Sequence, residues 1–176
     1  SLCALFPKTT DLSFLKDMAK QAMIAVFGSV EGAPKPFNNP FNDGDARYAR
    51  LLAAYEAAKG TELEGKAKKA IEYGECFRGH TYLNSKSVFQ VDIVSPKGNA
   101  IITDRASWYS GCFARAKLAA SWYDFKGQRG VKFYLGHVQK VKDGEKLFVG
   151  KPSAIEQFGV APGVTEAPTE TSSSIF

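Results

Sequence analysis

Residues 108–142 combine cationic and aromatic side chains in a pattern that could bind a polyanion. The stretch holds seven Lys or Arg residues against a single acid, Asp124, so its net charge is +6, and it carries eight aromatic rings. Cations neutralise phosphates and aromatic rings stack on nucleobases, and both together are typical of surfaces that bind single-stranded nucleic acid. These residue types therefore predict binding of a nucleic-acid strand.

A β-hairpin is the element that must position these side chains. Two alternating runs, residues 112–125 and 131–141, flank a glycine-bounded turn at 127–130, and this pattern is typical of a hairpin. Successive side chains of a strand point to opposite faces. One face is then small and apolar and is expected to face the core: Cys112, Ala114, Ala116, Leu118, Ala120, Trp122, Val131, Phe133 and Leu135.

The opposite face supplies most of the predicted binding residues. Rings expected to stack on bases are Phe113, Tyr123 and Tyr134, with Trp108 and Tyr82 as further candidates. Cations expected to neutralise phosphates are Arg115, Lys117, Arg129, Lys132 and Lys86, with Arg129 projecting from the turn.

Two alternatives to nucleic-acid binding stay open. Lys and Arg on an exposed strand are often only solvated, and aromatic residues are favoured in strands because they pack well. The chain could accordingly be a non-catalytic structural or protein-interaction module, whose basic hairpin binds an acidic protein. Binding of oligonucleotides with a defined site size would distinguish these hypotheses.

The overall charge favours a polyanionic partner. The chain has 176 residues, a net charge of +5 and a pI of about 9.0. The excess is local, because residues 66–151 carry a net charge of +9 while the rest of the chain has 7 bases against 11 acids. A hydrophobic fraction of 44% is that of a globular protein. We expect one domain over residues 1–158 and a tail over 159–176.

Catalytic and metal-binding patterns are missing from the sequence. The two histidines, His80 and His137, lack the further ligands that a zinc site needs, and the acids are scattered rather than clustered. No nucleophile or phosphate-loop motif occurs. We therefore predict no enzymatic activity, no cofactor and no metal. Three cysteines, without an apolar run of membrane-spanning length, predict a soluble protein of a reducing compartment, with no membrane partner.

The remaining elements predict an α+β fold that is mainly β with inserted helices. A strand over 2–6 precedes helices over 12–26, 46–59 and 62–73, the second with Asp45 as its cap. Short strands are expected over 77–85, 88–94, 100–103 and 146–149, and a final helix over 152–158. Short strands with early helices suggest a small twisted barrel. The Pro/Thr/Ser/Glu tail predicts disorder, and its last residues, Ile175 and Phe176, are candidates for binding a partner.

Several short segments, taken in order, carry a family resemblance. The more specific ones are Tyr109-Ser110-Gly111-Cys112 and the run Val-Gln-Lys-Val-Lys-Asp-Gly-Glu at 138–145. Weaker ones are Ala-Leu-Phe-Pro-Lys at 4–8, Tyr73-Gly74, Tyr82-Leu83-Asn84, Ile102-Thr103-Asp104 and Gly-Val-Lys-Phe at 130–133. Together these segments resemble the bacteriophage OB-fold single-stranded-DNA-binding proteins.

This resemblance implies an OB-fold five-stranded barrel with helical insertions, for which the first strand is expected to lie upstream of residue 1. It implies a protein that binds and coats single-stranded DNA without strong sequence specificity, in phage DNA replication or recombination, in the cytoplasm of the infected bacterial host. Replication or recombination proteins would be recruited through the C-terminal tail, although residues 165–176 hold only two acids. RNA as a partner and assembly into a homo-oligomer stay open.

Overall fold

In a computed structural model, which describes residues 1–104 and 106–147, the chain folds as a mixed α+β protein. The α+β class predicted from the sequence is therefore confirmed. The elements in chain order are β1 (Leu2–Pro7), α1 (Ser13–Phe27), β2 (Phe41–Asp43), α2 (Gly44–Ala58), α3 (Glu64–Gly74), the 3₁₀ helix η1 (Glu75–Phe77), β3 (His80–Lys86), β4 (Ile93–Val94), β5 (Phe113–Phe125) and β6 (Gln128–Lys142).

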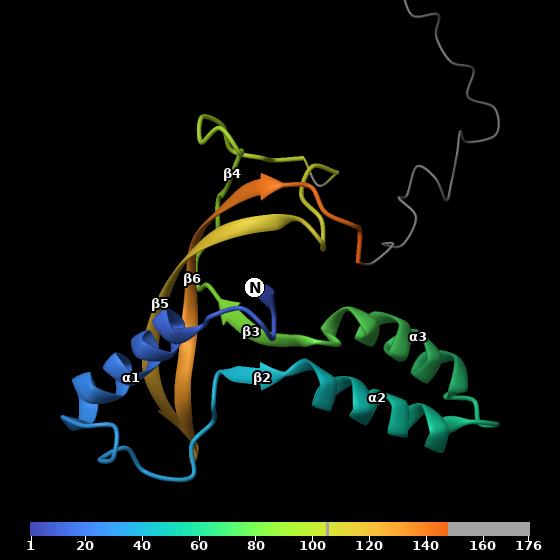
Figure 1. Ribbon diagram of the computed structural model, residues 1–176, viewed down its shortest axis with the longest axis horizontal. Helices are drawn as coiled ribbons and strands as arrows, with labels where there is room; N and C mark the ends of the chain where they lie inside the picture. Colours follow the sequence, from blue (N-terminus) through green and yellow to red (C-terminus); the bar gives the residue numbers. More distant parts are fainter. Residues whose placement is uncertain (105, 148–176) are drawn as a thin grey trace, which may run out of the picture.

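The six strands form one mixed sheet organised around β3 and β6 (Figure 1). Strand β3 pairs antiparallel with β1 and β2, and its C-terminal end pairs in parallel with β6. Strand β6 continues in parallel with β4 and pairs along its length with β5. Within the described residues no ladder joins β5 back to β1, so the sheet is curved but its strands do not close into a barrel.

The hairpin of β5 and β6 is confirmed, but its turn lies earlier than predicted. Phe125 pairs with Gln128, so the turn consists of Lys126 and Gly127, whose φ angles are 51° and 79°. Two central residues with positive φ are typical of the tight I′ turn, which matches the twist of paired strands. Residues 128–130 consequently belong to β6 rather than to the turn.

Helix α1 covers one face of this hairpin and forms the core with it (Figure 1). The helix begins where the Asp11 carboxylate accepts a hydrogen bond from the Ser13 amide, and it ends at Gly28. Its buried residues Ala19 and Met23 pack into a cluster with Leu83, Val131, Phe133 and Ala33. Burial of this apolar face orients the side chains of β5 and β6, which alternate between the two faces except at two register shifts.

Helices α2 and α3 form an insertion that extends from β2 and β3 on another side of the sheet (Figure 1). The cap of α2 is Asp43, which accepts a hydrogen bond from the Asp45 amide at 2.9 Å, so the prediction of Asp45 was wrong. Asp45 instead accepts a hydrogen bond from the Gly79 amide at 2.7 Å and ties the insertion to the start of β3. None of the described helices is long and apolar enough to cross a membrane.

Sequence periodicity was least accurate for the short strands. Strand β2 was not predicted from the sequence, and of the predicted strand 88–94 only β4 forms. The predicted strand 100–103 is reduced to one isolated bridge between Ile101 and Val94. The predicted final helix and the tail, with Ile175 and Phe176, lie outside the described residues.

Candidate nucleic-acid interface

The face of β5 and β6 opposite α1 carries most of the predicted cationic and aromatic side chains. The register pairs Lys132 with Ser121 and Tyr134 with Ala119, whereas the intervening Phe133 is 2% exposed in the core. We name this surface the cationic face, and it consists of Lys86, Phe113, Arg115, Lys117, Tyr123, Lys132, Tyr134 and Lys142. The outward positions of the two strands contain no Asp or Glu.

Lys132 lies between two tyrosine rings at the centre of the cationic face. Its ammonium nitrogen is 4.8 Å from the ring centroid of Tyr134 and 5.4 Å from that of Tyr123, distances at which a cation is attracted to an aromatic ring. The Tyr123 hydroxyl also accepts a hydrogen bond from the Asn38 side-chain amide at 2.9 Å, which holds this ring against the loop after α1. A phosphate could contact the ammonium while bases stack on the flanking rings.

Strand pairing brings Lys86 to the same surface. Lys86 pairs in parallel with Tyr134, and the preceding pair, Ser85 and Phe133, is buried on the opposite side. Directly paired residues share a face of the sheet, so the exposed Lys86 extends the cationic face from β6 onto β3. The sequence suggested Lys86 as a phosphate ligand, but only the register places it beside Tyr134.

The other end of the cationic face is built around Phe113. This ring is 54% exposed, and the Lys142 ammonium lies 4.5 Å from its centroid. Arg115 and Lys117 follow on β5, both exposed, with Lys117 at a register shift between Ala116 and Leu118. Lys142 was not among the predicted site residues. Its pairing with Phe113 depends on a second shift in the register, between Phe113 and Ala114, which the sequence pattern did not reveal.

Three predicted residues lie elsewhere. Tyr82 is 6% exposed, its ring is 5.0 Å from that of Phe77, and it offers no free face to a base. Arg129 pairs with Asp124 inside the hairpin, so alternation directs it to the side opposite Lys132. Trp108 is half-buried in the segment that precedes β5. The expectation that Tyr82 stacks on a base conflicts with its burial, because the insertion covers this part of β3.

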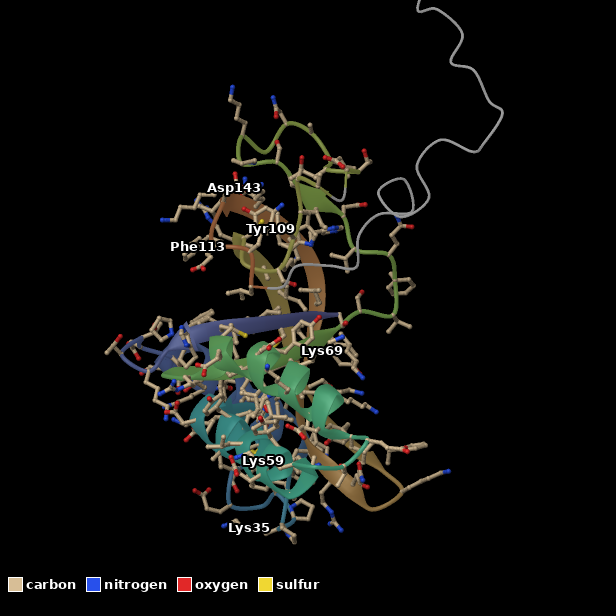
Figure 2. The ribbon with its side chains drawn as sticks, turned by 90° about the vertical axis from the view of Figure 1, so that its right-hand side faces the viewer. Lys35, Lys59, Lys69, Tyr109, Phe113 and Asp143 are labelled. Carbon is tan, nitrogen blue, oxygen red and sulfur yellow. The ribbon has the colours of Figure 1, made fainter. Side chains whose placement is uncertain are left out.

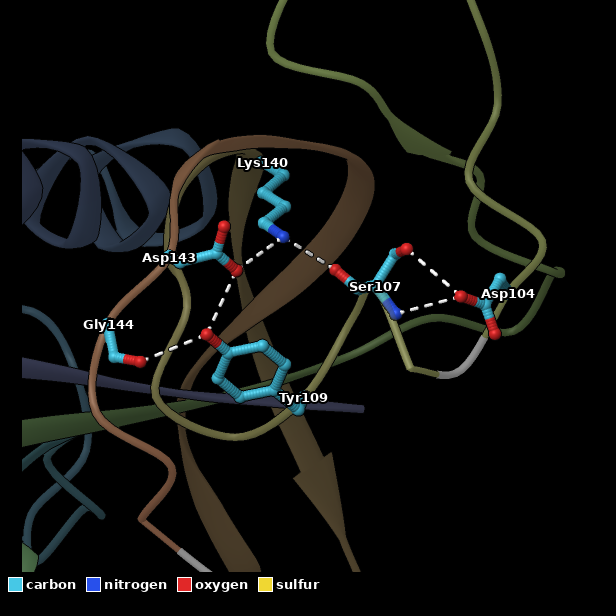
Figure 3. Close-up of polar contacts among 6 residues, drawn as sticks. All are labelled: Asp104, Ser107, Tyr109, Lys140, Asp143 and Gly144. Carbon is cyan, nitrogen blue, oxygen red and sulfur yellow. Dashed lines mark hydrogen bonds and ion pairs between the residues drawn. The ribbon is translucent and has the colours of Figure 1, made fainter.

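A polar network fixes the segment before β5 to the end of β6 (Figure 3). The Tyr109 hydroxyl donates to Asp143 Oδ1 at 2.9 Å and lies 2.9 Å from the Gly144 carbonyl oxygen. The Lys140 ammonium contacts Asp143 Oδ1 and the Ser107 carbonyl oxygen, each at 2.7 Å. Lys140 is only 7% exposed, so its charge is satisfied inside the protein by these oxygens.

Glycine is required where this network brings the two segments together. Gly111 has a φ of 117°, and a Cβ at this position would collide with the Glu145 carbonyl oxygen. The two specific motifs of the sequence, residues 109–112 and 138–145, are thus direct neighbours in space. Figure 2 shows Tyr109, Asp143 and Phe113 together at one end of the molecule, with Lys35 and Lys59 far from them.

The network favours the charged forms of Lys140 and Asp143 and the neutral form of the Tyr109 phenol. The hydrogen bond to Asp143, with partial desolvation, raises the pKa of Tyr109 to about 12. The Lys140 ammonium and then the Tyr109 hydroxyl lower the pKa of Asp143, and the Asp143 carboxylate raises the pKa of Lys140. At neutral pH the Asp143 carboxylate and the Lys140 ammonium are therefore charged, and the Tyr109 phenol is neutral. Among the described residues no group of His, Cys, Asp and Glu is arranged to hold a metal ion.

Comparison with known protein families identifies the chain. The sequence model of the family described as "Enterobacter phage Enc34, ssDNA-binding protein" matches residues 5–170. The chain belongs to this family. The family resemblance found in the sequence is therefore confirmed, and the match includes every residue of the cationic face.

Solved structures agree with this family at the level of the fold. The single-stranded DNA-binding protein from bacteriophage Enc34 is 16% identical to the chain, with a TM-score of 0.54 over 89% of this chain and 75% of that protein. The same phage protein in complex with single-stranded DNA is 18% identical, with a TM-score of 0.55 over 82% and 71% of the two chains. The comparison with curated proteins found no match.

Proposed function

We propose that this protein coats single-stranded DNA, which it binds on the cationic face without strong sequence specificity. The observation that carries the proposal is Lys132 between Tyr123 and Tyr134, with Lys86 beside Tyr134. The outward positions of β5 and β6 add no acid to this surface. Phosphate neutralisation and ring stacking both act on any sequence, because every nucleotide has a phosphate and every base has a flat face. Membership of a family of phage single-stranded-DNA-binding proteins supports the same conclusion.

The curved sheet is proposed to be an open barrel of the OB type, with α2 and α3 as an insertion before its central strand. A role in phage DNA replication or recombination, in the cytoplasm of the infected host, follows from the family and remains part of this proposal. The same holds for recruitment of partner proteins through Ile175 and Phe176. The surface has no feature that reads a 2′-hydroxyl, so RNA is the natural competitor in a binding assay.

Fluorescence anisotropy with oligo-dT at several salt concentrations tests the proposal. Five phosphate contacts, one for each cation of the cationic face, predict a slope of log affinity against log salt of about −3.5. Lys132→Gln should make the slope shallower by about 0.7, since it removes one contact. Lys20→Gln is the matched control, because it removes the same charge from the far side of α1, where Lys20 pairs with Asp17.

Duplex DNA of equal length distinguishes strand coating from general attraction to a polyanion. Equal binding to duplex would contradict the proposal. Absence of binding to any nucleic acid would restore the hypothesis of a protein-interaction module with a basic hairpin.

A further inference from the structure

A second cationic feature lies in a cavity between the helical insertion and the sheet. The cavity has a volume of about 530 Å³, which is within the usual range for small-ligand sites, and it is lined by residues of α2, α3, η1, β1 and β3. Arg47 of α2 and Asn84 of β3 line the cavity with side chains that can form hydrogen bonds. Leu51 and Ala70 contribute apolar surface. None of the lining residues is an Asp or Glu.

Within the described residues, Arg47 has aromatic partners but no acidic one. Its guanidinium carbon lies 4.0 Å from the ring centroid of Phe77 and 5.3 Å from that of Tyr82. None of the ion pairs among residues 1–104 and 106–147 includes Arg47. The surroundings of Arg47 are partly desolvated. This burial raises the pKa of the Cys3 and Cys76 thiols, and the charge of Arg47 opposes the rise. A cation with no carboxylate in such surroundings attracts an anion strongly.

The cavity and the cationic face share one side of β3. Alternation places Tyr82, Asn84 and Lys86 on one side of this strand, with Leu83 and Ser85 buried on the other. Asn84 lies in the cavity wall, and Lys86 lies two residues further along beside Tyr134, a rise of about 6.6 Å. A DNA strand that leaves the cationic face at Lys86 would therefore meet Asn84 and then Arg47.

From these observations we propose that the cavity binds one further nucleotide of the single strand, at the end of the path that begins on the cationic face. Arg47 contacts its phosphate or stacks on its base, as guanidinium planes do in single-strand complexes, and the Asn84 amide can hydrogen-bond to a base edge. Leu51 and Ala70 provide the apolar wall. The inference rests on the proposed function, and it adds the insertion to the DNA-binding surface.

The length of oligo-dT at which affinity stops rising is the first measurement. Arg47→Met keeps much of the side chain's packing on Phe77 but removes the charge. It should reach its maximum affinity at a shorter length than the unmodified protein. Beyond that length it should bind about tenfold more weakly, the loss expected for one stacked or phosphate-bound nucleotide. Its salt slope should be shallower by about 0.7.

Two variants separate the charge of Arg47 from other effects. Arg47→Lys should restore the salt slope without fully restoring affinity, because lysine keeps the charge and lacks the flat guanidinium. Arg50→Met is the matched control on the same helix, because Arg50 is exposed, does not line the cavity, and donates to the Ala46 carbonyl of its own helix. It should match the unmodified protein at every length.

Cys3 provides a reporter that needs no substitution. It pairs with Asn84 across β1 and β3, lines the cavity, and is exposed to reagents. Alkylation by N-ethylmaleimide, followed by mass spectrometry of the Cys3 peptide, should be slowed by long oligo-dT and not by oligonucleotides too short to pass Lys86. This readout remains valid if Arg47→Met destabilises the fold.

The outcomes distinguish this inference from the function on which it rests. Tight binding by the unmodified protein, with Arg47→Met equal to it at all lengths and Cys3 unprotected, would overturn the nucleotide site and leave the coating function intact. No binding of single strands at any length would overturn both. Protection of Cys3 by a peptide with a C-terminal Phe, but not by oligo-dT, would overturn the nucleotide site in favour of a peptide site.

Discussion

The two faces of the β5–β6 hairpin differ completely in environment although their residues alternate along the same strands. On one face Trp122 packs against Phe27, with 5.1 Å between the ring centroids, and Phe133 is 2% exposed. On the other face Lys132 and Tyr134, the immediate neighbours of Phe133, remain accessible. The comparison shows that one hairpin can supply the core and the proposed DNA-binding surface at once, because strand alternation keeps the two functions on separate sides.

The largest expected effect comes from removing a core side chain from the face of the hairpin that packs against α1. Phe133→Ala should lower the free energy of unfolding by about 3–5 kcal/mol, because it leaves a cavity under α1 at one of the two most completely buried large side chains. Tyr134→Ala, one residue along, should lower it by under about 1 kcal/mol. Urea denaturation of both variants measures the contrast, and similar losses would show that the outer face is also structural.

The converse experiment changes a side chain of the cationic face and measures the affinity of the protein for DNA. Tyr134→Ala should weaken oligo-dT binding by about 1–3 kcal/mol, the range for one stacked base, whereas Tyr134→Phe should bind nearly normally because the ring remains. Phe14→Ala is the control, since Phe14 is 76% exposed on α1, away from the cationic face. Anisotropy titration provides the affinities. A Tyr134→Ala variant with unchanged affinity would remove this ring from the interface.

The smallest expected effect concerns the polar network at the end of β6, where Tyr109 and the buried Lys140 contact Asp143. The pKa of Tyr109 is raised from 10.0 to about 12, so folding favours the protonated phenol. The stabilisation is complete below about pH 10 and is lost as the pH rises through about 12. The unmodified protein should therefore lose more stability than Tyr109→Phe over this range.

Urea midpoints measured from pH 8 upward for both proteins test this dependence, because other ionising groups contribute equally to each. A constant difference between the two proteins across the range would contradict the role assigned to the Tyr109–Asp143 hydrogen bond. On the acid side, the lowered pKa of Asp143 predicts a stabilisation that is present above the unfolded-state value and lost as the pH falls through the folded-state value.

Most of the cationic face could be predicted because its signals are local. Alternation in β5 assigned Phe113, Arg115, Lys117 and Tyr123 to the side opposite Trp122, and the structure agrees. Arg129 was misplaced because the turn was read from Gly127 and Gly130, whereas the positive φ angles belong to Lys126 and Gly127. Which two residues form a turn depends on how the strands pair, and the sequence pattern fitted more than one register.

Tertiary contacts decided the remaining residues. Tyr82 and Lys86 share a face of β3 and have similar local sequence signals, yet Phe77 and Arg47 cover the first and leave the second exposed. Likewise, nothing in the spacing of Lys140 and Tyr109 indicates that they approach one Asp143 oxygen. Such contacts join residues far apart in the chain, so they arise only when the insertion and the strand ends are packed.

The sequence by itself determined the α+β class, the long hairpin, its division into an apolar and a cationic side, and the family to which the chain belongs. Periodicity and short motifs are properties of neighbouring residues, so they can be read without coordinates. The tertiary structure alone decided that the insertion covers Tyr82, that Lys86 and Lys142 join the cationic face, and that Arg47 lines a cavity beside it. These features depend on long-range register and on helix packing, which bring together side chains that no local pattern connects.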